Sequence, residues 1–190
     1  MKPLTATLTL LLFIFSSSAQ VIPLKNSLQT DIVKVISDYP NGFKNISGEQ
    51  VMENPQTTEF ESRVALKEAI KCRVFKYSSN TKEIYSWEAE MMRTEDFDEA
   101  TKKFRSIYNS LQHLSANING TNAVFKADYI KPTESIKFTT IVFDTGDKSP
   151  ELKKLKVALL LEGEMLEWVI RVQVYEKEKE DNERGRQVDK

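Results

Sequence analysis

Residues 85–115 read YSWEAEMMRTEDFDEATKKFRSIYNSLQHLS, and this stretch decides the fold class. In its first part, apolar and polar side chains alternate, which is typical of an antiparallel strand with one face in water. From Glu95 onward the apolar side chains recur every three or four residues, which predicts an amphipathic helix over 95–115. A strand followed directly by such a helix predicts a helix packed on a sheet.

The apolar side chains of this helix form one stripe. They lie within an arc of about 120° on a helical wheel. The stripe consists of Phe97, Ala100, Phe104, Ile107, Tyr108, Leu111 and Leu114. Thr94 is the predicted N-cap, and the acidic residues that follow it would oppose the positive end of the helix dipole. Burial of the stripe would supply on the order of 10 kcal/mol before the entropic cost, so we expect it to form much of the core.

Shorter patterns on both sides predict the remaining elements. A helix is expected over 28–39, ended by Pro40-Asn41-Gly42, and residues 48–58 read as a loop. Alternating side chains predict strands over 60–66, 70–74, 123–129, 136–142, 154–161 and 168–174, and a further one could begin over 43–47. The segment 154–161 stays open, because Ser149-Pro150-Glu151 would also suit a helix start. A hairpin around Gly163 favours the strand.

These elements define an α+β fold. We expect an antiparallel sheet of about seven to eight strands with two helices packed on one face. The order of a helix followed by strands occurs twice, which suggests an internal duplication of a helix-plus-strands unit.

The N-terminus has the layout of a secretory signal. Lys2 precedes the apolar run Leu4–Phe15, and small residues follow it up to Ala19. About 12 apolar residues span only ~18 Å as a helix, against a ~30 Å hydrocarbon core, so a cleaved signal is preferred over a membrane anchor. We therefore expect a signal peptide over 1–19, one domain over 20–176 and a disordered charged tail over 177–190. The protein would be exported, either periplasmic or secreted, with no membrane segment after cleavage.

Composition and motifs argue against several functions. The chain has 27 basic and 28 acidic residues and a net charge of −1, so no overall field favours nucleic acid. Its one Cys and one His cannot form a structural zinc site or a disulfide framework. No phosphate-binding loop, dinucleotide-binding fingerprint or metalloprotease motif occurs, so we expect no cofactor and no metal.

Isolated reactive side chains favour structural roles. His113 is expected opposite the buried stripe of its helix, in water. Cys72 shares a strand face with Ile70 and Val74 and is expected to be a buried, inert thiol. Glu88 and Glu90 lie about 7 Å apart on one strand face, within range for acid catalysis, but this face is expected to be solvated.

Aromatic side chains are the remaining lead. They lie on apolar strand faces that could oppose the helices, where they either fill a core or line a cavity for a small apolar ligand. The candidate ligand-binding residues are Tyr85, Trp87, Phe125, Tyr129 and Trp168.

The stretch Asp38-Tyr39-Pro40-Asn41-Gly42-Phe43-Lys44-Asn45-Ile46, with the signal and the strand–helix–strand middle, resembles small uncharacterised exported proteins of Bacteroidota. The resemblance implies a periplasmic location. It brings no catalytic or binding residues to this chain.

Three hypotheses follow. The first is an exported, non-enzymatic domain that binds or interacts with an unknown protein. The second is a carrier of a small hydrophobic ligand in an aromatic-lined cavity between sheet and helices. The third is a hydrolase that works through carboxylates alone.

Overall fold

The computed structural model describes residues 27–77, 83–147, 149 and 152–177. The signal predicted over 1–19 and nearly all of the tail predicted over 177–190 lie outside these residues. The elements are α1 (Ser27–Ser37), a 3₁₀ turn η1 (Tyr39–Asn41), β1 (Ser47–Glu53), β2 (Thr57–Ser62), β3 (Lys71–Tyr77), β4 (Ile84–Thr94), α2 (Phe97–Leu111), β5 (Ser115–Ile118), β6 (Thr121–Val124), β7 (Phe138–Phe143), β8 (Leu155–Glu164) and β9 (Glu167–Glu176).

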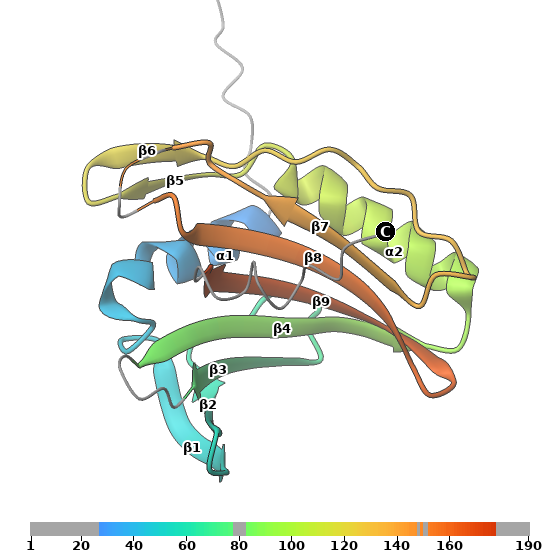
Figure 1. Ribbon diagram of the computed structural model, residues 1–190, viewed down its shortest axis with the longest axis horizontal. Helices are drawn as coiled ribbons and strands as arrows, with labels where there is room; N and C mark the ends of the chain where they lie inside the picture. The colour runs from blue at the N-terminus through green and yellow to red at the C-terminus, as the bar shows by residue number, and fades with distance from the viewer. Residues whose placement is uncertain (1–26, 78–82, 148, 150–151, 178–190) are drawn as a thin grey trace, which may run out of the picture.

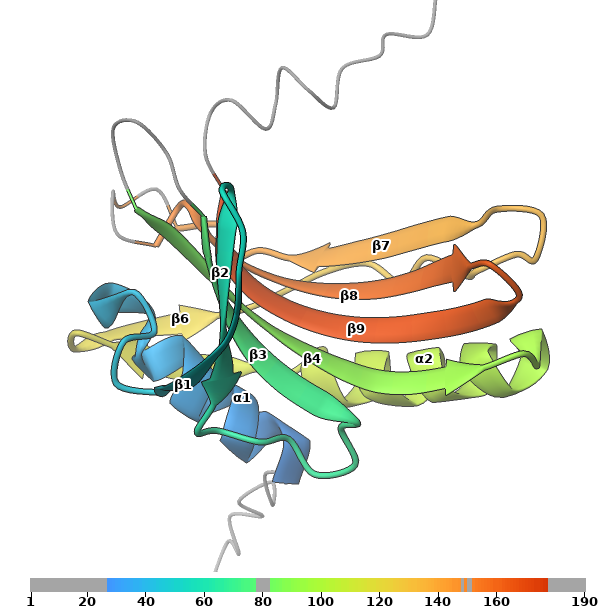
Figure 2. The ribbon, with the colours of Figure 1, turned by 90° about the horizontal axis from the view of Figure 1, so that it is seen from below.

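Seven of the strands form one antiparallel sheet in the order β1-β2-β3-β4-β9-β8-β7. Both helices lie on the same side of this sheet (Figures 1 and 2). β5 and β6 form a separate two-stranded hairpin that contacts α1. The α+β prediction is therefore confirmed. The last strands of the two helix-plus-strands series, β4 and β9, pair at the centre.

The core lies between the helices and the sheet. α2 packs across β4, β8 and β9, and α1 packs on α2 and on β5. The predicted apolar stripe of α2 contributes to this core. Ala100, Phe104 and Leu111 are fully buried, as is Leu114, which follows the helix. Segment 154–161 is a strand, as the hairpin argument favoured.

A β-bulge at Met91 changes the phase of β4. Glu90 pairs with Arg171 and Met92 with Ile170, so Met91 is the extra residue. Before the bulge the odd-numbered residues face the helices, and after it the even-numbered ones do. Glu90 and Arg93 therefore share the face of the sheet opposite the helices, although they are three residues apart.

Several sequence predictions about these elements are wrong, among them the strands over 123–129 and 60–66, since β6 ends at Val124 and β2 ends at Ser62. Residues 48–58 were predicted as a loop but form most of β1 and the start of β2. These strands form a hairpin at the edge of the sheet, where neither face of β1 is buried, so the sequence shows no alternation of apolar and polar residues there. The cap of α2 is Asp96, whose carboxylate accepts from the amides of Asp98 and Glu99. Thr94 Oγ1 instead accepts from Asp96 N at 3.2 Å and donates to Glu99 at 2.7 Å.

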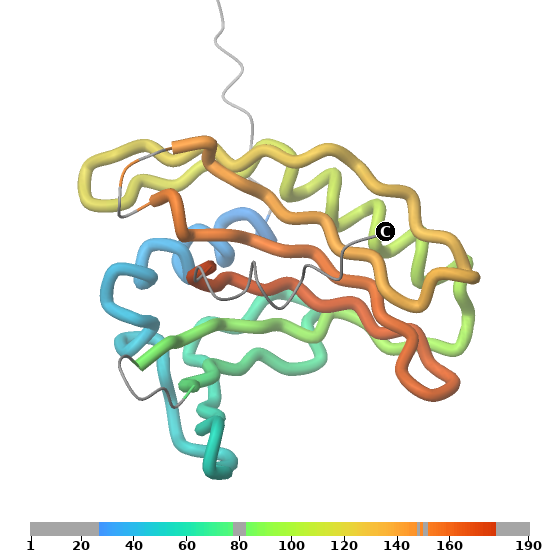
Figure 3. Tube along the Cα trace, viewed as in Figure 1, coloured from blue at the N-terminus to red at the C-terminus, as the bar shows by residue number. Residues whose placement is uncertain are grey.

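In the strand predicted over 136–142, the even-numbered residues were expected to face the core, but the odd-numbered residues do so. Phe138 and Val142 are 54% and 40% exposed, whereas Ile141 and Phe143 are buried. After β6 the chain runs back alongside β7 (Figure 3), where Lys126 and Asp144 exchange two backbone hydrogen bonds. This contact covers one end of the β7 edge.

Replacement of Phe104 by alanine tests the packing of α2. Its ring is fully buried, so the variant should lose about 3–5 kcal/mol of unfolding free energy in urea titrations. Lys102→Ala, on the exposed face of the same helix, should stay within about 0.5 kcal/mol. Equal losses in the two variants would contradict the position of the stripe.

Candidate functional site

The five candidate aromatic residues do not line one cavity. Trp87 and Phe125 are fully buried and Trp168 is 5% exposed, so they belong to the core. Trp87 Nε1 donates to Ser62 Oγ at 2.8 Å, and the Trp168 ring lies 4.8 Å from that of Phe97.

Tyr129 and Tyr85 are only partly buried. Tyr129 packs on Tyr108 with a ring separation of 5.0 Å, and the Arg105 guanidinium lies 5.3 Å from its ring. Tyr85 points elsewhere, into a surface hollow. It is the one member of the predicted set on the wall of this hollow.

The hollow has a volume of about 810 Å³ and lies where β4 begins and β9 ends. Figure 1 shows the segment after α1, the start of β4 and the β5–β6 hairpin at this end of the sheet. Its wall consists of Tyr39, Pro40, Asn41, Gly42, Phe43, Lys44, Asn45, Glu83, Tyr85, Ile118, Asn119 and Glu176. Seven of these residues belong to the segment 38–46, which follows α1.

A buried carboxylate shapes this stretch. Asp38 is 7% exposed. Its oxygens accept from the amides of Asn45 at 3.0 Å and Ile46 at 3.3 Å, and from the side chains of Asn41 at 2.9 Å and Asn45 at 2.6 Å. The Asp38 carbonyl also accepts from the amides of Asn41 and Phe43. One residue therefore closes the whole turn, which we call the Asp38 turn (residues 38–46).

Two consecutive residues in the Asp38 turn have left-handed backbone conformations. Gly42 has φ of 62° and Phe43 has φ of 56°. Glycine adopts this conformation readily, but for a bulky residue such as Phe43 it costs about 1–2 kcal/mol. The Phe43 side chain is 1% exposed, so its burial offsets this cost. The turn thus holds one fixed shape.

Charged groups face the hollow beside Tyr85. The Lys44 ammonium lies 5.9 Å from the centre of the Tyr85 ring. The Tyr85 hydroxyl donates to Glu83 at 3.0 Å, and Glu83 also pairs with Lys76 at 2.5 Å. Burial and the bond to Glu83 raise the pKa of Tyr85, while the hydrogen bond from Lys76 lowers the pKa of Glu83. At neutral pH the wall therefore presents the uncharged phenol of Tyr85, the ammonium group of Lys44 and the carboxylate of Glu83, which is ion-paired with Lys76.

A second polar feature is the charged cluster on the helix-free face of the sheet. Arg171 of β9, whose side chain is 13% exposed, lies among four carboxylates. It contacts Glu88 at 3.4 Å and Glu90 at 3.8 Å, and it forms short ion pairs with Glu162 and Glu164. The expectation that Glu88 and Glu90 lie on a solvated face is wrong, since Glu90 is 3% exposed.

The bulge in β4 adds a second arginine to the charged cluster. Arg93 donates to Glu90 at 3.2 Å, to Glu164 at 3.2 Å and to Glu167 at 3.0 Å. Sequence alternation would have placed Arg93 on the helix side with Trp87 and Ala89. The extra residue at Met91 reverses that phase, and a bulge has no reliable signal in this sequence.

The carboxylates of the cluster differ in their pKa. Burial raises the pKa of Glu88, against the bond from Gln173 and the charge of Arg171. Burial alone would also raise the pKa of Glu90, but hydrogen bonds and charge from Arg93 and Lys71 outweigh it and lower the pKa. The hydrogen bond from Arg171 lowers the pKa of Glu164.

The geometry of the cluster favours a structural role. A pair of catalytic carboxylates needs open space between them for the scissile bond or a water molecule. Here the Arg171 guanidinium contacts all four carboxylates, and none of them lines the hollow beside Tyr85. The cluster thus joins β4, β8 and β9 through side chains.

The other reactive side chains lie apart. Cys72 is a buried free thiol, and burial raises its pKa, as predicted for a structural cysteine. His113 is exposed, as the helical wheel predicted. Within the described ranges, no group of three or more His, Cys, Asp or Glu side chains could hold a metal ion, and no helix is long and apolar enough to cross a membrane.

Comparison with known proteins adds no assignment. No family model, no curated protein and no solved structure matches this chain.

Replacement of Asp38 by asparagine tests the Asp38 turn. The amide nitrogen cannot accept from the donors that now surround the carboxylate, so buried amides lose their partner. We expect a loss of about 2–3 kcal/mol in unfolding free energy. Asp128→Asn, at an exposed site, is the matched control and should change it by less than about 0.5 kcal/mol. Equal stability of the two variants would contradict this role of Asp38.

Replacement of Glu88 or Glu164 of the charged cluster by glutamine should change the pH dependence of the unfolding free energy in opposite directions. The folded-state pKa of Glu88 is raised, so the stability that its protonated form contributes is lost as pH rises through that pKa. Glu88→Gln should therefore gain stability relative to the wild type as pH rises above about 4, the ordinary pKa of a glutamate. The folded-state pKa of Glu164 is lowered, so its contribution is present at neutral pH and lost in acid. Glu164→Gln should therefore be less stable than the wild type at pH 7 and converge with it in acid.

Denaturant titrations of the two variants and the wild type across this pH range measure both effects. Parallel curves for Glu88→Gln and Glu164→Gln would show that the two carboxylates share one environment, contrary to this description.

Proposed function

We propose that this protein is a non-catalytic binding domain and that the hollow beside Tyr85 is its binding site. The observation that carries the proposal is the Asp38 turn: a buried carboxylate fixes two left-handed residues in a shape that forms one wall of the hollow. A fixed wall lowers the entropic cost of binding. Export to the periplasm or out of the cell, expected from the N-terminus, is part of the same proposal.

The wall of the hollow indicates the kind of ligand. Tyr39 and Tyr85 offer aromatic rings, and Lys44 offers an exposed ammonium group. The hollow is open to solvent, so it would leave part of its ligand in water. These features suit a segment of a partner protein that places an apolar side chain on the rings and a carboxylate near Lys44.

The carrier hypothesis places its ligand in an aromatic-lined cavity between the sheet and the helices. Trp87, Phe125 and Trp168 fill the space between sheet and helices, so they leave the surface hollow as the place for a small apolar ligand. An open hollow buries such a ligand less completely than the enclosed pockets typical of carriers. The partner segment is therefore the preferred occupant.

Photo-crosslinking from Lys44 tests the proposal. A diazirine-bearing lysine analogue replaces Lys44 in the cells that make the protein, and the same analogue replaces the exposed Lys102 as a control. We expect one discrete protein adduct from position 44 and none from position 102. Tyr85→Ala should lower the yield at least tenfold while circular dichroism and thermal unfolding show a retained fold.

Three results would count against the proposal. Identical products from positions 44 and 102 would contradict a specific site. An adduct that persists unchanged in Tyr85→Ala would place the contact outside the hollow. An added mass of a few hundred daltons instead of a protein would favour the carrier hypothesis.

A further inference from the structure

The turn between β8 and β9 exposes two large apolar side chains. Met165 and Leu166 have relative exposures of 105% and 84%, the highest values among the large hydrophobic residues that the structure describes. We call this pair the apolar tip. Single exposed apolar residues are common on protein surfaces, but an adjacent pair at the end of a hairpin presents both side chains to a partner at once.

The apolar tip departs from the residues that its turn favours. Glu164 pairs with Glu167, so Met165 and Leu166 are the two central residues of a tight hairpin turn. Met165 has a φ of 56°, a conformation in which glycine is favoured at this position. Neither burial nor turn geometry accounts for methionine and leucine here.

Ion pairs hold the base of the hairpin. Arg93 of β4 bonds to Glu164 at 3.2 Å and to Glu167 at 3.0 Å, the two residues that flank the tip. Arg171 forms a further short ion pair with Glu164. The base of the tip is thus fixed to β4 and is cross-linked between β8 and β9, which lowers the cost of ordering the tip on binding.

The hairpin projects beyond its neighbours. β4 ends where Thr94 pairs with Trp168, and β7 begins where Phe138 pairs with Glu162. The turn between Glu162 and Trp168 therefore extends past both strands, as Figure 1 shows. Phe138, which begins β7 and pairs with Glu162, is 54% exposed and adds apolar surface near the base of this hairpin.

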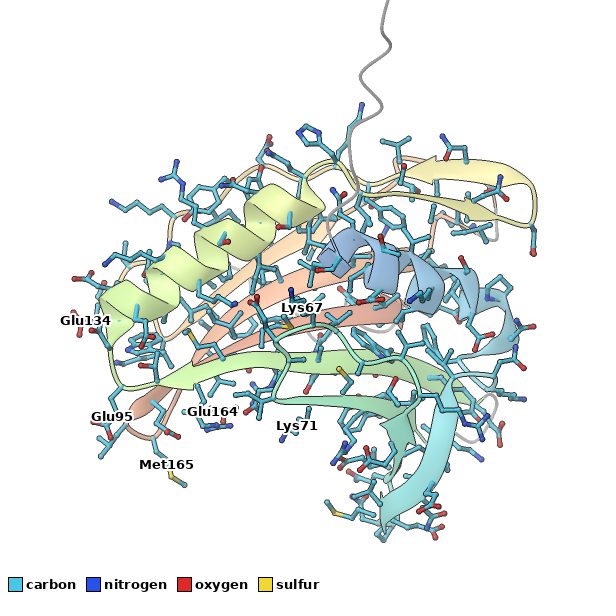
Figure 4. The ribbon with its side chains drawn as sticks, turned by 180° about the vertical axis from the view of Figure 1, so that it is seen from behind. Lys67, Lys71, Glu95, Glu134, Glu164 and Met165 are labelled. Atoms are coloured by element: carbon cyan, nitrogen blue, oxygen red, sulfur yellow. The ribbon has the colours of Figure 1, made fainter. Side chains whose placement is uncertain are left out.

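Carboxylates lie at the same end of the molecule as the apolar tip. Figure 4 shows Glu95, Glu134 and Glu164 at the same end of the molecule as Met165. Glu95 and Glu134 are exposed. The carboxylates of Glu95, Glu134, Glu164 and Glu167 outnumber the two cations Arg93, which pairs with Glu164 and Glu167, and Lys137, whose ammonium lies 4.5 Å from the Trp168 ring. The surroundings of the tip are therefore acidic.

We propose that the apolar tip inserts into an apolar pocket of another protein, and that lysine or arginine side chains rim this pocket. The exposed apolar pair supplies the buried contact, and the carboxylates select a basic rim. The same carboxylates oppose contact with anionic lipid headgroups. This surface is separate from the hollow, because Glu167 begins β9 beside the tip and Glu176 ends it at the hollow.

Photo-crosslinking at the tip tests this proposal with the full chain. A diazirine analogue of methionine replaces Met165 in the cells that make the protein. We expect a protein adduct whose crosslinked peptide is apolar and flanked by Lys or Arg, with a yield that falls as salt concentration rises. The double charge reversal Glu95→Lys, Glu134→Lys should lower the yield at least tenfold. Glu49→Lys, an exposed site on β1, is the control and should not change it.

A turn variant separates binding from folding. Met165→Gly with Leu166→Ser gives the hairpin residues that its turn favours, so the melting temperature should stay equal or rise. Co-purification of the wild-type partner identified by crosslinking should fall at least tenfold. Loss of folding in this variant would contradict the description of the turn, and retained binding would overturn the proposal.

Other outcomes of the crosslinking would also overturn the proposal. These are no adduct, an adduct with a second copy of this chain, an adduct with a protein whose contact peptide lacks basic residues, and binding of the tip to vesicles of phosphatidylglycerol and phosphatidylcholine that Met165→Gly, Leu166→Ser abolishes. None of these results would bear on the hollow, which is tested from Lys44.

Discussion

The antiparallel pairing of β4 with β9 joins the two parts of the sheet. The first four strands end with β4 and the last three end with β9, so this ladder is the backbone connection between them. α2 packs on one face of this strand pair, and on the other face Arg171 of β9 pairs with Glu88 and Glu90 of β4. Any change in the register of β4 on β9 would move both layers.

Side chains on both faces specify this register. A slip of β9 by one residue would turn Arg171 toward the apolar side chains of α2 and leave Glu88 and Glu90 without it. Breaking a buried ion pair in this way costs about 3–5 kcal/mol, although the intact pair adds little net stability. The charged cluster thus favours one register of β9 on β4, and its carboxylates are engaged in the ion pairs that specify this register.

Much of the fold could be predicted from the sequence, because burial on one face imposes a period on apolar residues. The stripe from Ala100 to Leu114 and the alternation in β9 carry that period clearly. β1 carries none, because its polar residues lie on an exposed edge. The bulge at Met91 and the choice of which face of β7 is buried depend on the strands that pair with β4 and β7. These partners lie elsewhere in the sequence, so local patterns do not reveal them.

The candidate site was harder to predict for a similar reason. Tyr85 could be identified as a candidate because it is aromatic, but its four companions fill the core or pack beside α2. Asp38 gave no signal of its own, since its role depends on amides seven and eight residues later in the chain. The Pro40-Asn41-Gly42 sequence indicated a turn but not the wall that it forms.

The two proposed binding surfaces lie at opposite ends of β9, and the hollow is proposed to be a preformed site. Amide hydrogen exchange, followed by NMR in the free protein, tests this claim most directly. If the Asp38 turn is rigid, the amides of Asn45 and Ile46 should exchange as slowly as those of β4 and β9, through global unfolding. Exchange of these two amides at the rate of exposed loop amides, with β4 and β9 still protected, would contradict a preformed hollow.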